Sequence, residues 1–188
     1  QNYVSVKWMF NSLDNVVVLP LESGRQARQL SGFLNSQYLG LGIKKIENNL
    51  HRLDEYYYEC ANVPINHKWD SALCPVSVNS ERLFDQLNPN NDPYILICNS
   101  HSNSNNLKLN IDEKNYKKIF FTKQTDNIFD WYKLIINAIQ IHTVNTSFVH
   151  LVELCFANGE ETSTQFYFYE FDRPKCFISK LPWKIMKS

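Results

Sequence analysis

Three short apolar runs limit how this chain can fold more than any other feature. They span residues 16–21, 94–98 and 118–122, and none shows the alternation of apolar and polar residues that marks a half-exposed strand. A strand that is apolar on both sides has to be covered on both faces, as in a parallel sheet. We therefore expect an α/β fold with a mainly parallel central sheet and helices on both faces.

Helices are predicted at three places along the chain. Residues 25–38 carry apolar side chains at helical spacing, and Ser23 stands where an N-cap belongs. Residues 80–87 have the pattern of a second, shorter helix. Residues 128–141 are apolar nearly all round, which predicts the most buried helix of the molecule.

Two pairs of further strands complete the expected sheet. Residues 41–46 and 55–60 read as a hairpin, because both are rich in strand-forming residues and an Asn pair lies between them. Residues 148–156 and 165–171 read as an antiparallel C-terminal hairpin joined by a turn at Asn158 and Gly159. The sequence therefore predicts antiparallel pairs at the edges of an otherwise parallel sheet.

Length and charge exclude several classes of protein. The chain has 188 residues, with 19 Lys and Arg balanced by 19 Asp and Glu, so its formal net charge is zero. A neutral chain is poorly matched to nucleic acid or to an anionic membrane surface. No apolar run approaches the roughly 18 residues that a membrane span needs. We expect a single domain over residues 1–188, cut from a larger cytoplasmic protein, because the chain begins at Gln1 without a signal peptide.

The sequence carries no signature of catalysis, and we assign no catalytic, cofactor-binding or metal-binding residue. A phosphate-binding loop after residues 16–21 would need several glycines, but only Gly24 is present. Cys60, His67 and Cys74 are evenly spaced, yet their spacing fits no zinc motif. No CxxC pair occurs among the cysteines, so we expect reduced thiols.

The order of the N-terminal elements resembles a von Willebrand factor A domain. The resemblance covers residues 13–141: a first strand, a turn and a helix, then a hairpin, with 94–98 as a later central strand. The family holds a metal ion with an Asp-x-Ser-x-Ser motif after its first strand and an Asp after a later strand. Here Glu22, Ser23 and Asn99 stand at those places, so the resemblance implies a metal site that has lost its aspartates.

A metal-free domain of this kind resembles the minimal-scaffold domains of MAP-kinase scaffolds in the yeast mating pathway. The likeness implies a non-catalytic protein-interaction module of pheromone-response signalling, with a MAP kinase and its MAP-kinase kinase as partners. It further implies that the domain promotes phosphorylation of the MAP kinase by favouring a kinase conformation with an open activation loop.

Other interpretations stay open at this stage. Residues 118–122 and 128–141 resemble a late strand and helix of XPF/ERCC1-type nucleases, without the catalytic Glu-Arg-Lys motif, which would suit a structural subunit of a DNA-repair or meiotic complex. Trp131 in a late helix would also suit a pleckstrin-homology-like module, which requires a β-barrel before that helix. An enzyme with an unrecognised site ranks last, because no charged cluster converges in the sequence.

Overall fold

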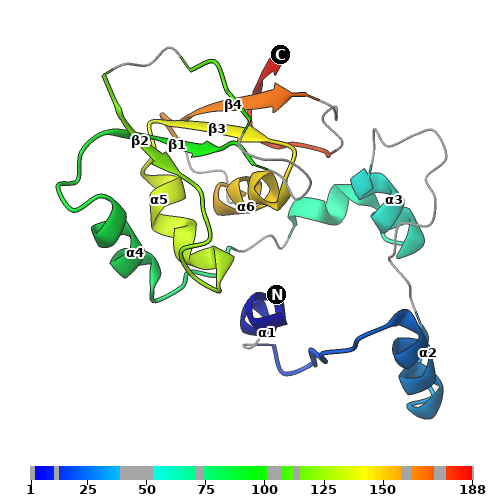
Figure 1. The fold of residues 1–188 in the computed structure, drawn as a ribbon. Coiled ribbons are helices and arrows are strands. Elements are labelled where there is room, and N and C mark those ends of the chain that lie inside the picture. Colours follow the sequence, from blue (N-terminus) through cyan, green and yellow to red (C-terminus); the bar gives the residue numbers. More distant parts are fainter. Residues whose placement is uncertain are drawn as a thin grey trace.

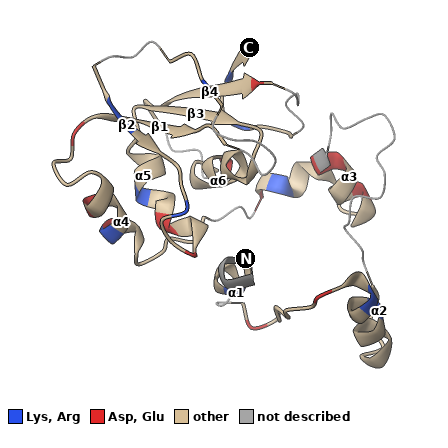
Figure 2. Cartoon of the chain, viewed as in Figure 1, with Lys and Arg blue, Asp and Glu red and all other residues tan. Residues whose placement is uncertain are grey.

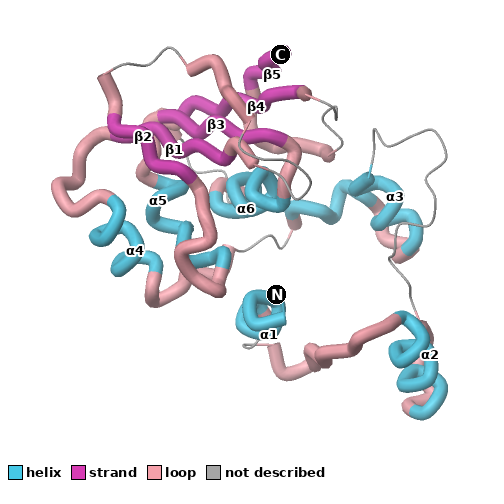
Figure 3. Tube along the Cα trace, in the orientation of Figure 1, coloured by secondary structure: helices cyan, strands magenta, loops and turns pink. Residues whose placement is uncertain are grey.

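The computed structural model describes residues 3–10, 13–38, 53–70, 74–100, 107–111, 115–157, 162–171 and 177–187. Figure 1 shows the fold and Figure 3 its helices and strands. The described residues of the N-terminal half include the helices α1 (Tyr3–Met9), α2 (Gly24–Phe33), α3 (Leu53–Cys60) and α4 (Ser80–Leu87) and the 3₁₀ helix η2 (Ile65–Trp69). All of the described strands follow, with the remaining helices between them: β1 (Tyr94–Cys98), β2 (Lys117–Phe120), η3 (Ile128–Trp131), α5 (Tyr132–Ile136), β3 (Gln140–Val144), α6 (Ser147–Cys155), β4 (Gln165–Glu170) and β5 (Lys184–Lys187).

The five strands form one sheet in the order β2-β1-β3-β4-β5, and every neighbouring pair is parallel. Every residue of β1 and of β3 is buried. The expected α/β fold with a mainly parallel central sheet is thus what the structure has. The continuous apolar run at 94–98 predicted the central strand correctly, because both faces of β1 are covered.

The order in which strands are added to the sheet reverses once, at β1. It leaves β1 for β2 on one side, and then every later strand is added on the other side of β1. Parallel connections are right-handed, so this reversal places the connection from β1 to β2 on the opposite face from the later connections. In agreement, α5 and α6 lie together with α4 on one face (Figure 1), and residue Asn110 of the first connection contacts Tyr169 on the other.

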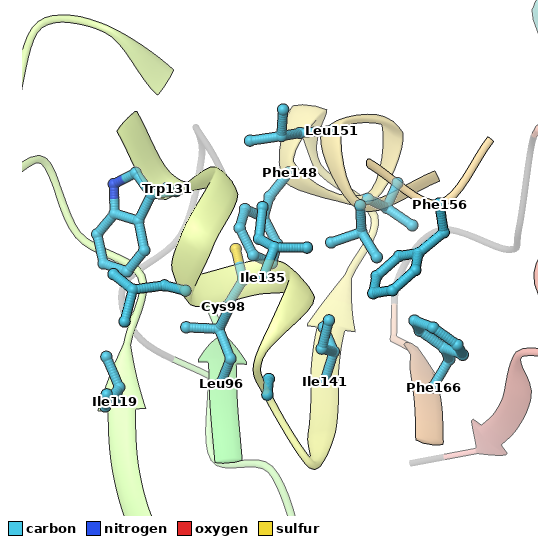
Figure 4. Close-up of a cluster of buried hydrophobic side chains, with 14 of the residues drawn as sticks. Leu96, Cys98, Ile119, Trp131, Ile135, Ile141, Phe148, Leu151, Phe156 and Phe166 are labelled. Atoms are coloured by element: carbon cyan, nitrogen blue, oxygen red, sulfur yellow. The ribbon is translucent and has the colours of Figure 1, made fainter. Parts of the chain in front are cut away.

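The helix-bearing face holds the main hydrophobic core. Alternate side chains of the strands, such as Leu96, Ile141 and Phe166, point toward the helices (Figure 4). Phe148 of α6 and Ile135 of α5 fill the space above them and are fully buried. This packing follows the period of two in each strand, because the residues between these positions face the opposite side.

The opposite face has no helix among the described residues, although we expected helices on both faces. It is organised around His142 of β3, whose ring stacks on Tyr167 at 4.5 Å. Gln140 Oε1 lies 2.9 Å from Nε2 of His142, and the Tyr169 hydroxyl lies 2.9 Å from Nδ1. Burial lowers the pKa of His142 to about 4, and the nearby positive charge of Lys118 acts in the same direction. The ring is therefore neutral near pH 7, which suits its buried position.

Residues 16–21 are not a strand, which corrects the first of the sequence predictions. Val17 is 78% exposed, and the backbone bonds of this segment are local, from Val16 N to Leu13 O and from Leu21 N to Leu19 O. A β-branched run becomes a strand only when another strand lies beside it. Ser23 does cap a helix as expected, since its side chain accepts a hydrogen bond from Gln26 N, but α2 ends at Phe33 and lies away from the sheet (Figure 1).

Two predicted strands are helices. Residues 55–60 belong to α3, and residues 148–156 belong largely to α6. The apolar side chains of α6 do recur at helical spacing, and Thr146 caps it by accepting a hydrogen bond from Phe148 N. The run of Val, Leu and Phe residues led to the prediction of a strand, because residues that favour strands are also common in buried helices.

The C-terminal half therefore differs from the expected antiparallel hairpin. β4 does begin at Gln165, but it pairs in parallel with β3 and with β5, and residues 184–187 were not foreseen as a strand. The long helix predicted over 128–141 is instead a 3₁₀ turn and the five-residue α5, followed by β3. A parallel sheet also contradicts the pleckstrin-homology-like alternative, and the hairpin strand at 41–46 lies outside the described residues.

A buried carboxylate fastens the last segment of the chain to α6. Glu153 is 1% exposed, and its Oε1 accepts hydrogen bonds from Trp183 Nε1 at 2.5 Å and from Ser179 Oγ at 2.7 Å. Its Oε2 accepts a bond from the backbone N–H of Lys180 at 2.9 Å. Three donors thus converge on one side chain, and together they place residues 179–183 before β5 adds to the sheet.

Replacing Glu153 by Gln should destabilise the fold by about 2–4 kcal/mol. The NH₂ group of Gln is itself a donor, so it cannot accept the hydrogen bonds that one carboxylate oxygen of Glu153 accepts. Urea unfolding at pH 7 measures this loss. Glu81→Gln is the matched control, since Glu81 pairs with Lys133 on the surface and its side chain is 65% exposed, so the expected loss is below about 1 kcal/mol. Equal stabilities for the two variants would contradict the proposed role of Glu153.

The neutral state of His142 predicts a loss of stability in acid. Because its pKa in the folded protein lies below the ordinary value of 6.5, the contribution is complete above pH 6.5 and falls as the pH drops toward 4. Between pH 7 and pH 4 the loss should be about 3 kcal/mol. A His142→Gln variant should lack this part of the pH dependence in urea unfolding, whereas His67→Gln, at an exposed position on η2, should retain it.

Candidate functional site

The reversal of strand order at β1 marks one place along the carboxyl ends of the strands, between β1 and β3. β1 and β3 are neighbours, but the chain leaves their carboxyl ends toward opposite faces. In open α/β sheets this topological switch point opens a crevice outside the carboxyl ends of the strands, and ligands bind there. The segment after β1 begins at Asn99, and the segment after β3 leads into Ser147 at the start of α6.

Most polar side chains directly at these strand ends already serve the fold. Asn99 Nδ2 donates to Leu107 O at 3.0 Å, and Leu107 N donates to Asn99 O at 2.7 Å. The Cys98 thiol lies 3.6 Å from the hydroxyl of Thr146, and burial raises its pKa. A buried, protonated thiol is a poor nucleophile, so Cys98 has a structural role.

A groove of about 530 Å³ lies beside this edge. Its polar rim includes Ser100, which follows β1, and Ser147. The apolar part of its wall comes from α1, from the segment after β2, from η3 and from α6. The apolar lining residues are Val6, Met9, Phe121, Ile128, Phe129, Trp131, Leu151 and Leu154. An apolar wall with a few polar groups is typical of a binding site.

Helix α1 forms one side of the groove although it is far from the other walls in the sequence. The Trp8 ring lies 5.2 Å from the ring of Phe129, and Trp8 and Met9 pack against the core cluster. Val6 remains 40% exposed and faces the groove. The groove therefore already accommodates a short helix of this chain along one wall.

The titratable groups that line the groove are Lys123, Asp126 and His150. Lys123 and Asp126 lie 3.3 Å apart in an exposed ion pair. His150, expected in a strand, lies on α6, and its ring meets Phe177 edge-on at 5.3 Å. Its pKa is lowered chiefly by burial of the ring, against the opposing influence of the Asp54 carboxylate.

The residues considered as metal ligands in the sequence are separated in the structure. His67 Nδ1 lies 2.5 Å from Asp70 Oδ2, and Cys74 contacts Cys155. Ser23 caps α2, away from the edge where Asn99 lies. In the described part of the chain, no group of three or more His, Cys, Asp or Glu side chains is placed to hold a metal ion. Nor is any of the described helices long and apolar enough to span a bilayer.

Comparisons with family models, with curated proteins and with solved structures find no match to this chain. The function of the groove is therefore inferred from its geometry. Sequence reasoning missed the groove because its walls come from segments more than 100 residues apart. One local signal was present: Thr146 before apolar residues at helical spacing marks the start of α6, and with it one wall of the groove.

Proposed function

We propose that this chain is a non-catalytic protein-interaction domain that binds an amphipathic helical segment of a protein kinase in the groove beside α1. The observation that carries the proposal is the groove itself, an open and largely apolar hollow beside the topological switch point. Surfaces of this composition bind the apolar face of a helix through a few anchoring side chains.

The position of α1 indicates which kind of segment the groove can bind. This short helix already lies along the wall, with Trp8 against Phe129 and Met9 against the core. Val6 of α1 and the α6 residues Leu151 and Leu154 line the same groove. A second helix lying parallel or antiparallel to α1 would extend the same packing, with apolar side chains inward and polar ones toward Lys123 and Asp126.

The identity of the kinases rests on the resemblance to von Willebrand A-like scaffold domains. It suggests a MAP kinase and its MAP-kinase kinase as partners in a signalling cascade of the cytoplasm. Binding would promote phosphorylation by stabilising a conformation of the MAP kinase in which the activation loop is accessible. The size of the effect is bounded by the difference in affinity of the domain for the two kinase conformations.

The segment 13–38 supports a second contact with the same partner. Phe33 at the end of α2 is 87% exposed and Leu34 is 59% exposed, while Val17 is 78% exposed. Apolar side chains that gather on one segment without cover are a mark of an interaction surface. No residue of α2 is buried, so this helix contributes nothing to the core.

The direct test is phosphorylation of a MAP kinase by its upstream kinase with and without the purified 188-residue chain. The proposal expects a several-fold higher rate with the chain present, and binding of at least one kinase by calorimetry. Val6→Glu should weaken that binding at least tenfold, or about 1.4 kcal/mol, by placing a charge in the groove.

Val78→Glu is the matched control, because Val78 is 91% exposed and does not line the groove. It should leave binding and phosphorylation unchanged. An unaltered rate together with no detectable binding of either kinase would contradict the proposed function. Equal effects of the two variants would contradict the groove as the binding surface.

A further inference from the structure

We propose that Cys74 and Cys155 are a redox-active pair that closes into a disulfide when the protein meets hydrogen peroxide. Their sulfur atoms lie 3.4 Å apart, although the two residues are 81 positions apart in the sequence. Both side chains are partly exposed at the rim of the core, so a small oxidant can reach them. The inference does not depend on the proposed function.

The other described cysteines are placed differently. Cys98 is buried at the end of β1, and its sulfur lies next to the Thr146 hydroxyl rather than next to another thiol. Cys60 ends α3, where the Tyr56 side chain is its neighbour. Among the described residues, Cys74 and Cys155 are the two whose sulfurs face each other. The short distance means that a bond between them needs a side-chain rotation rather than a rearrangement of the fold.

The surroundings assign different roles to the two sulfurs. The hydrogen bond between the thiols raises the pKa of Cys155 well above its ordinary value, and burial of Cys155 adds to the effect. We assign the first attack to Cys74. Because the hydrogen bond to Cys74 is the largest cause of the raised Cys155 pKa, oxidation of Cys74 removes that cause, and Cys155 can then act as the second nucleophile. The Cys74 thiolate attacks one oxygen of the peroxide, which breaks the O–O bond and gives a sulfenic acid and one molecule of water after protonation.

The second step uses the neighbouring thiol of Cys155. Cys155 attacks the sulfenic sulfur of Cys74, the S–O bond breaks, and a second molecule of water leaves with the proton of Cys155. In total the two thiols lose two electrons and two protons, and one peroxide is reduced to two waters. The new bond would tie the segment that leads into α4 to the last residue of α6.

The test is mass-spectrometric mapping of the wild-type chain after treatment with a small excess of hydrogen peroxide, quenched with an alkylating agent. We expect one intramolecular disulfide between the peptides of Cys74 and Cys155, while Cys60 and Cys98 are alkylated. The thermal unfolding midpoint should rise by roughly 5–10 °C on oxidation and return after reduction, because a long loop is closed.

The variants separate this pair from the other thiols. Cys74→Ser should abolish both the disulfide and the thermal shift, whereas Cys60→Ser should retain both, because the Cys60 thiol lies beside Tyr56. A Cys155→Ser variant should stop at the sulfenic acid of Cys74, which a dimedone probe labels. In the wild-type protein, a disulfide that joins other cysteines would overturn the proposal, and so would alkylation of both Cys74 and Cys155 after peroxide treatment.

Discussion

The complete burial of β1 and β3 is the constraint on which the rest of this structure depends. Two adjacent parallel strands with every side chain out of water require a cover on each face. Because the strand order reverses at β1, the two faces have different covers. Right-handed connections put α5 and α6 on one face and the first connection on the other. The helix-bearing face is filled with apolar side chains, whereas the other face is closed by a hydrogen-bonded aromatic cluster around His142.

The two faces stabilise the sheet by different means. On the helix side, Leu96 and Ile141 are covered by large side chains such as Phe148, and burial of apolar area supplies the free energy. On the other side, Lys184 lies 4.9 Å above the ring of Tyr167, which itself stacks on His142. This second arrangement depends on charge and protonation, so the two faces respond differently to pH.

Parts of the fold could be predicted because their signals are local. The run at 94–98 is short and apolar on both sides, and the helix at 80–87 has the expected bounds. The failures concern segments whose residues suit two structures. Residues 148–156 have strand-forming composition but helical spacing, and the pattern at 128–141 conceals the turn at which α5 gives way to β3. Residues 16–21 show that strand-forming composition does not make a strand without a neighbouring strand.

The candidate site was beyond sequence reasoning for a different reason. Its position follows from strand order, and strand order depends on pairings between residues far apart, such as Ile97 with His142. The walls then add α1, whose place against Phe129 is a tertiary contact without a sequence motif. The sequence did indicate the individual cysteines, but only the fold brings Cys74 and Cys155 together.

The outermost strands of the sheet have a consequence for solubility. β2 contributes Lys117 and Lys118, and β5 contributes Lys184 and Lys187, so each of these strands carries two positive charges (Lys and Arg are blue in Figure 2). Phe120 of β2 is 46% exposed and Ile185 of β5 is 41% exposed. Exposed apolar side chains on an outermost strand favour edge-to-edge association with another molecule. Such pairing would bring lysines of two copies together, and their repulsion guards these short edges against aggregation into extended β structure.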